Sequence, residues 1–218
     1  MSEQETKSGT GWQMLLLAII LIGFPAGSWY YLSEGFKYQL AARDQLRKTD
    51  QLQTYEQLEL IKGEIPETLT GKMFVIALLP YSEKVDLKDF GHTLNQLHEQ
   101  FDKPKNIQFW NVFEDRDSSF IQHFIEEANM KNDEEQLLYF KADKASFKGF
   151  VDQMGFTETE MADFGHFPQL VLVDDSLYIR RIFRSDIANE IKQLVEVTAL
   201  LLPERSKPKA RLVRESEK

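Results

Sequence analysis

The sequence predicts an α/β domain in which helices flank a central mixed β-sheet. Two unbroken apolar runs, residues 73–79 and 170–173, have the composition of strands that are buried on both faces. Helical patterns alternate with strand patterns between these runs, which is typical of parallel strands joined by right-handed crossovers. A turn at residues 174–176 and an alternating stretch at 177–183 add an antiparallel hairpin to the sheet.

The remaining elements follow from apolar spacing and from capping residues. Asp86 and Asp117 are expected to cap two helices, and either Asp143 or Ser146 begins a third. An acidic loop is expected at residues 157–164. The predicted order after the first strand is a helix over 86–101, a strand over 106–113, a helix over 117–129, a strand over 137–140, a helix ending at 155, the hairpin, and a helix over 187–202.

Composition excludes several classes of function. The formal net charge of −9 argues against a nucleic-acid-binding protein. The chain of 218 residues contains no cysteine, so disulfides, thiol catalysis and cysteine-ligated metals are ruled out. Phosphate-loop, serine-elbow and His-Glu zinc motifs are also absent from the sequence. We therefore expect that the protein is not an enzyme.

The N-terminal part of the chain predicts a membrane anchor. A polar N-terminus, residues 1–11, precedes residues 12–32, which carry no charge and would extend for about 30 Å as a helix. Trp12 stands at one end and Trp29 at the other, as interfacial aromatic residues do. We predict one transmembrane helix; the alternative is a cleaved signal peptide, which the lack of leading positive charge disfavours.

The segments on either side of the globular domain have different characters. Residues 33–61 are rich in helix-forming residues, which favours a helical stalk, with a flexible linker as the alternative. The domain itself is expected at residues 62–202. A basic, polar and flexible tail is expected at residues 203–218.

Three motifs resemble those of a known family. Thr70-Gly71-Lys72 leads into the first apolar strand, and His166 stands eight residues before Asp174. The second hairpin strand contains Tyr178-Ile179-Arg180. With the anchor and stalk, this pattern resembles the Sco/SenC proteins, which are membrane-anchored, thioredoxin-like copper chaperones of cytochrome oxidase. The resemblance implies a thioredoxin-like fold.

The resemblance also implies a topology and partners. It places the soluble domain on the non-cytoplasmic side of the membrane, whereas the basic residues after the span favour the cytoplasmic side. The expected partners are the membrane, through residues 12–32, and subunits or assembly proteins of a respiratory complex.

The copper ligands of that family are missing here. Its Cys-x-x-x-Cys loop corresponds to residues 80–86, where Ser82 and Asp86 occupy the cysteine positions. A hydroxyl, a carboxylate and the imidazole of His166 make a poor Cu(I) site, because soft thiolates select that ion. We expect no metal or other cofactor; the alternative is weak copper binding by His166 and Asp86. His166 is otherwise an ordinary hydrogen-bonded or exposed loop histidine.

Pro168 suggests a retained binding groove. Thioredoxin-like proteins carry a cis-proline at this place, so the resemblance implies a cis bond between Phe167 and Pro168; the alternative is an ordinary trans proline. In thioredoxins this proline borders a groove for extended peptides. We therefore expect a partner-binding surface formed by Tyr81, Ser82, His166, Phe167 and Pro168.

These expectations lead to one function and two alternatives. The first is a membrane-anchored, redox-inactive, Sco-related protein that assists assembly or stability of a respiratory membrane complex, cytochrome c oxidase, by protein binding. The second is a weak copper-binding chaperone that uses His166. The third is a structural subunit of a membrane complex, contacting partners through its anchor and stalk.

Overall fold

The computed structural model describes residues 12, 14, 16, 17, 19–44, 46, 51–81, 87–130, 132–164 and 167–202. The chain divides into two compact units, Met1–Gln45 and Leu46–Lys218. Each unit is described by itself.

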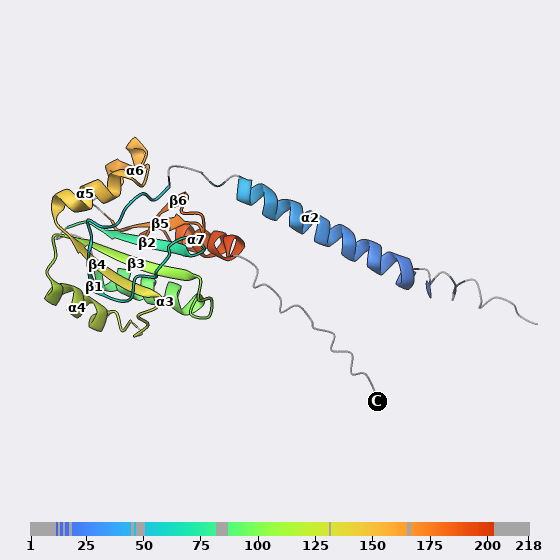
Figure 1. Ribbon diagram of the computed structural model, residues 1–218. Coiled ribbons are helices and arrows are strands. Elements are labelled where there is room, and N and C mark those ends of the chain that lie inside the picture. The colour runs from blue at the N-terminus through green and yellow to red at the C-terminus, as the bar shows by residue number, and fades with distance from the viewer. Residues whose placement is uncertain are drawn as a thin grey trace, which may run out of the picture. The chain divides into compact units, whose positions relative to one another are not determined.

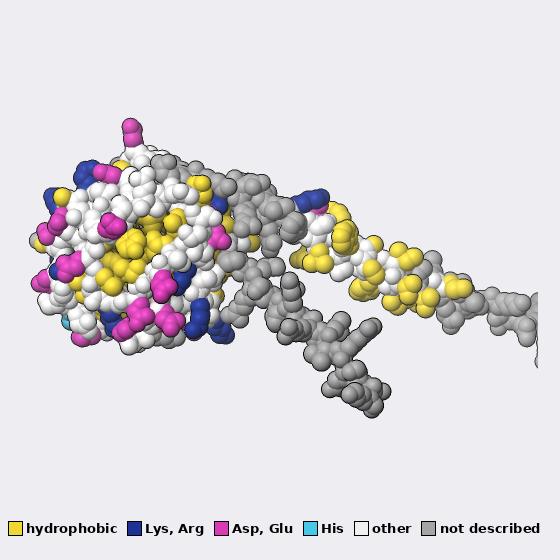
Figure 2. Space-filling model, viewed as in Figure 1, with side chains coloured by type: hydrophobic (Ala, Val, Ile, Leu, Met, Phe, Trp, Pro, Cys, Tyr) yellow, Lys and Arg dark blue, Asp and Glu magenta, His cyan; other side chains and the backbone are white. Residues whose placement is uncertain are grey.

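The N-terminal unit is helical and carries exposed apolar side chains. A short π-helix, η1 (Ile19–Gly23), is followed by the α-helix α2 (Phe24–Asp44). Trp29 and Tyr31 are 77% and 82% exposed, and Figure 2 shows hydrophobic side chains along the described helix with a Lys-Glu pair near one end. Among the described residues, no helix combines the length and the apolar character needed to cross a membrane. The anchor at residues 12–32 stays a prediction.

The second unit contains a six-stranded sheet (Figure 1), which is mixed, as the sequence predicts, and has one strand, β1, more than expected. Along the sheet the strands lie in the order β1-β4-β3-β2-β5-β6. The three central strands β4, β3 and β2 run parallel, while β1, β5 and β6 are each antiparallel to a neighbour. The strand bounds are β1 Glu59–Lys62, β2 Met73–Leu79, β3 Ile107–Glu114, β4 Leu137–Ala142, β5 Gln169–Val173 and β6 Ile179–Arg184.

Helices cover both faces of this sheet, and two hydrophobic cores result. Val75 of β2 faces the core formed with α3, α4 and α7, whereas its neighbour Ile76 faces the core formed with α5. Because successive side chains of a strand point to opposite faces, an entirely apolar strand such as β2 serves both cores. The helices are α3 Leu87–Gln100, α4 Ser118–Glu127, α5 Lys144–Asp152, α6 Glu158–Asp163 and α7 Ala188–Leu201.

The capping residues determine where three helices begin. The Asp117 and Asp143 carboxylates accept backbone N–H groups at the starts of α4 and α5, as predicted, and these hydrogen bonds lower the pKa of both carboxyl groups. Helix α6 occupies the segment for which an acidic loop was expected. It has a capping box, in which Thr157 Oγ1 accepts the Glu160 N–H and the Glu160 carboxylate accepts the Thr157 N–H.

Residues 51–62, which we call the strap, differ from the expected helical stalk. The Leu52 N–H donates to the Leu177 carbonyl at 2.9 Å, beside the start of edge strand β6. Leu52 is buried in the α5-side core, and the Tyr55 ring lies 5.3 Å from the Trp110 ring in the same core. The strap ends as β1, which pairs with β4 at the other edge of the sheet. The folded domain therefore includes residues N-terminal to Lys62, because the strap buries its apolar side chains there.

Candidate functional site

Four chain segments meet at one end of the central strands. Strands β2 and β3 are parallel and finish there, Leu79 being paired with Phe113. Strand β5 is antiparallel to β2 and begins there, with Gln169 opposite Leu78. Strand β6 also finishes there, because Arg184 is paired with Gln169. The residues at these strand ends and just beyond them make up the candidate site: Tyr81, Glu114, Arg116, Phe167, Pro168, Arg184 and Ser185.

Tyr81 is held in place by the end of β3. Its backbone N–H donates to the Glu114 carboxylate at 2.7 Å. The Arg116 guanidinium lies 4.1 Å from the centre of the Tyr81 ring and 4.4 Å from that of Phe120. Cation–π contacts at exposed positions contribute about 0.5–1 kcal/mol each. Because Tyr81 remains 49% exposed, one aromatic ring is both positioned and accessible.

Pro168 is held in place by Ser185, the residue that follows β6. Its carbonyl accepts the Ser185 hydroxyl at 2.6 Å and the Ser185 N–H at 3.3 Å. No peptide bond between described residues is cis, so the Phe167–Pro168 bond is trans and the expected cis-proline is wrong. Gln169, the next residue, begins β5 and pairs with β6, so strand pairing and Ser185 hold the backbone at this proline.

Gln169 adds a buried polar group directly after Pro168. Its side chain is 2% exposed, and its Nε2 atom has no hydrogen-bond partner among the described residues. Most buried polar groups are paired in folded proteins, so this amide is an exception directly after Pro168.

Phe167 presents a second exposed ring at the site. It is 37% exposed, and the Arg184 guanidinium lies 5.3 Å from the centre of its ring. Arg184 also donates to both oxygens of Asp186, at 3.0 and 2.7 Å, and these hydrogen bonds lower the pKa of the Asp186 carboxyl. Phe164, which forms an isolated bridge with Phe167, stacks on Phe147 with a centroid distance of 6.0 Å. The Phe167 segment is therefore attached to the aromatic packing of α5.

The remaining predicted site residues lie outside the described residues. Ser82, Asp86 and His166 belong to this group, so their arrangement and the copper alternative stay predictions. In the part of the chain that is described, no three His, Cys, Asp or Glu side chains are grouped so that they could hold a metal ion.

Four residues of the site are not among the sequence predictions: Glu114, Arg116, Arg184 and Ser185. They belong to β3, β6 and the turns that follow, and only the pairing register places them beside Tyr81 and Pro168. A signal was available, because the carboxyl ends of neighbouring parallel strands meet at one edge of a sheet. The polar stretch 114–116 directly follows the alternating strand and could have been assigned to that edge.

The described site combines aromatic rings, guanidinium groups and strand-end backbone. Arg116 and Arg184 each stack on a ring that is partly exposed, and the chain has no thiol to place beside them. Such groups bind apolar and anionic partner side chains. The described residues of the site can therefore take part in recognition of such side chains.

Comparison with solved structures identifies the fold. A candidate protein disulfide isomerase from Bacteroides thetaiotaomicron superimposes with a TM-score of 0.54 at 13% identity, over 73% of this chain and 92% of that one. BsSco, a member of the Sco family of cytochrome c oxidase assembly proteins, has a TM-score of 0.53 at 10% identity, over 71% and 95% of the two chains. A yeast mitochondrial 1-Cys peroxiredoxin has a TM-score of 0.50 at 18% identity, over 71% and 75%.

Sequence comparison adds no family to this likeness. No protein-family model matches the chain. No curated protein matches it either. At these identities the likeness establishes the fold alone, which is thioredoxin-like as the sequence predicts.

Proposed function

We propose that this protein is a membrane-anchored, redox-inactive binding module that assists the assembly or stability of a respiratory membrane complex, cytochrome c oxidase. It would do so by binding a protein partner at the candidate site. We further propose that it is not an enzyme, that it works without a metal, and that its thioredoxin-like domain lies on the non-cytoplasmic side of the membrane.

One observation carries the proposal: the site end of a thioredoxin-like sheet holds exposed aromatic rings in a chain without cysteine. Thiol–disulfide exchange requires a thiolate, which this chain cannot supply. Tyr81 and Phe167 each lie against a guanidinium group and keep a large part of their surface accessible. Aromatic and arginine side chains are enriched among the residues that dominate protein–protein binding energy.

The identity of the complex is proposed by analogy. BsSco is named for its membership of a family of cytochrome c oxidase assembly proteins, and its fold is similar to that of this domain. The exposed apolar side chains of the N-terminal helical unit support a membrane location, because exposed apolar surface of this extent favours transfer out of water.

The test is co-purification from native membranes with matched variants. Full-length tagged protein is extracted in gentle detergent, and its partners and bound copper are measured by mass spectrometry and metal analysis. Tyr81→Ala is expected to lower partner recovery about tenfold or more, because truncating a central aromatic contact costs roughly 2 kcal/mol. Tyr178→Ala is the matched control, since Tyr178 lies at the opposite end of the strands.

Three outcomes would contradict parts of the proposal. Equal recovery with Tyr81→Ala and Tyr178→Ala would remove the candidate site from partner binding. Partners unrelated to respiratory complexes would reject the analogy with BsSco. Copper at about one equivalent per chain, lost in His166→Ala, would replace the binding module with a copper chaperone.

A further inference from the structure

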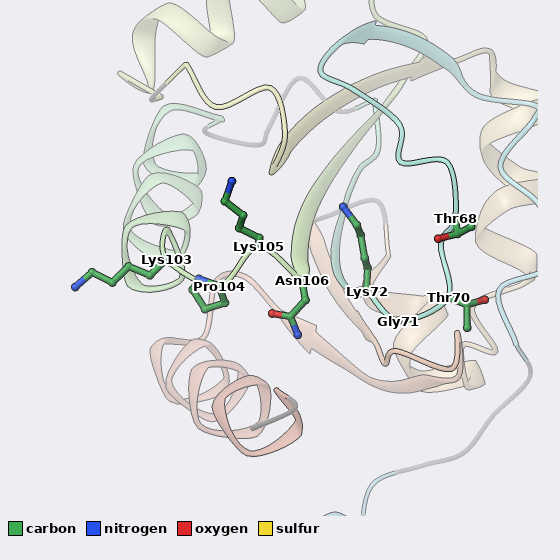
Figure 3. Close-up of a pocket in the computed structure, with 8 residues that line it drawn as sticks. All are labelled: Thr68, Thr70, Gly71, Lys72, Lys103, Pro104, Lys105 and Asn106. Carbon is green, nitrogen blue, oxygen red and sulfur yellow. The ribbon is translucent and has the colours of Figure 1, made fainter. Parts of the chain in front are cut away.

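A cationic pocket lies at the end of the strands opposite the candidate site. It has a volume of about 610 Å³ and is formed by the turn before β2 and the connection between α3 and β3 (Figure 3). These segments are adjacent because β2 and β3 are parallel, with Met73 paired with Ile107. The residues that line the pocket are Thr68, Thr70, Gly71, Lys72, Lys103, Pro104, Lys105 and Asn106.

The charge of this pocket contrasts with that of the chain. Three lysines line it and no acidic residue does, although the whole chain has 26 basic and 35 acidic residues. Figure 3 shows the side chains of Lys72 and Lys105 extending in a similar direction from the two segments, whereas that of Lys103 points away. Two ammonium groups are therefore available on the same side of the pocket.

Acidic side chains neutralise the positive charges of Lys72 and Lys105 only weakly. The Lys105 ammonium lies 3.5 Å from the Glu135 carboxylate, but their side chains are 87% and 70% exposed. Such exposed ion pairs contribute little to stability and are easily exchanged for another anion. Within the described ranges, Lys72 forms no ion pair.

Backbone hydrogen bonds fix the floor of the pocket. The Gly71 N–H donates to the Asp175 carbonyl at 2.7 Å, and the Met73 N–H donates to the Asn106 carbonyl at 2.8 Å. Gly71 has φ of +89°, a conformation that side chains disfavour, and a Cβ atom there would meet nothing within 4 Å. The turn is thus hydrogen-bonded to its neighbours and leaves open space beside Gly71.

We propose that this pocket binds the phosphate group of a phosphorylated ligand. Lys72 and Lys105 supply the positive charge, and the hydroxyl of Thr68, which is directed toward the Lys72 side chain in Figure 3, supplies a neutral donor. The volume exceeds that of a phosphate ion and lies within the range of small-molecule sites, so the pocket has room for an organic phosphate. This site is independent of the proposed partner-binding function, because it shares no residue with the candidate site.

The test is a titration of the full-length protein in detergent micelles with glycerol 3-phosphate, followed through the amide NMR signals of Gly71, Lys72 and Asn106. Saturable shifts are expected, and chloride at equal ionic strength is expected to produce none. Lys72→Gln/Lys105→Gln is expected to weaken the affinity about tenfold or more, because charge-assisted hydrogen bonds are lost. Lys144→Gln/Lys192→Gln, which changes the net charge equally outside the pocket, should retain the affinity within about twofold.

A second arm identifies the source of the phosphate. The same signals are followed in micelles doped with phosphatidylglycerol or with phosphatidylcholine. Shifts with glycerol 3-phosphate support a soluble phosphate ester, and shifts with phosphatidylglycerol alone support a lipid headgroup. The proposal is overturned if neither probe produces saturable shifts, if acetate reproduces them, or if the two double variants bind equally.

Discussion

At the scale of single residues, Tyr139 is a polar group in an apolar environment. It belongs to β4, lies in the core that the sheet forms with α3, α4 and α7, and is 1% exposed. The hydroxyl has no hydrogen-bond partner among the described residues, and burial raises the pKa of the phenol well above the usual value of about 10. An unpaired buried hydroxyl lowers the stability of the folded state.

Tyr139→Phe is therefore expected to raise the free energy of unfolding by about 1 kcal/mol at neutral pH, because it removes that hydroxyl without leaving a cavity. Urea denaturation of both proteins would measure the difference. Trp110→Phe provides a contrast, since it shortens a buried ring whose Nε1–H donates to Gln108 at 3.2 Å, and it should lower the stability. A loss of stability in Tyr139→Phe would mean that the hydroxyl has a partner.

The raised pKa of Tyr139 also makes stability depend on alkaline pH. Its unfolded phenol releases its proton near pH 10, while the folded phenol retains it to higher pH. The unfolded state then binds fewer protons, so stability that is present below pH 10 is lost as pH rises above it, by up to about 1.4 kcal/mol per pH unit. Denaturation between about pH 9 and 11 should show a shallower decline for Tyr139→Phe than for the wild type; parallel declines would refute the assignment.

At the scale of secondary-structure elements, α6 depends on its N-cap residue, Thr157. A helix this short gains little free energy from propagation, so the capping box of Thr157 and Glu160 contributes much of the stability of α6. The helix leads directly to Phe164 and then to Phe167 of the candidate site.

Thr157→Ala is expected to destabilise α6 by about 1 kcal/mol, because the Glu160 N–H loses its acceptor. Amide hydrogen exchange at Glu160 and Met161 should become about fivefold faster or more. Thr159→Ala removes the same hydroxyl within the helix, where alanine is favourable, and should slow that exchange or leave it unchanged. Equal acceleration by both variants would argue against the cap.

Elements differ in how far the sequence determines them. Strands β2 and β5 were predictable because they are buried throughout and apolar at every position except Gln169, and an unbroken apolar run of this length fits a strand that is covered on both faces. Strand β1 was missed because its four residues are exposed or half-buried and are defined only by pairing with β4. Helix α6 was missed because its acidic composition suggested a loop, although Thr157-x-x-Glu160 is a helix-start motif.

The residues of the candidate site also differ in whether the sequence alone could identify them. Tyr81, Phe167 and Pro168 could be named because each adjoins a strand that the sequence reveals. Arg116 and Arg184 could not, because their approach to these rings depends on strand order and register, which no local pattern encodes.

At the scale of the whole molecule, the strap decides where the folded domain begins. A chain that starts at Leu46 keeps Leu52 and Leu58 in the core and should have the unfolding free energy of the intact domain. A chain that starts at Lys62 loses both leucines and most of β1, and we expect a stability lower by about 4 kcal/mol or more. Denaturant unfolding of the two fragments measures this difference, and equal stability would show that the strap adds nothing.

Strand β2 also sets the distance between the two sites at its ends. Seven residues at about 3.3 Å each place the cationic pocket and the candidate site roughly 23 Å apart. This separation exceeds twice the Debye length of about 8 Å at physiological ionic strength, so a charge bound at one end is screened from the other. The two ends can therefore be occupied at the same time, and a ligand in the pocket leaves the affinity of the other site unchanged unless the buried strand itself shifts.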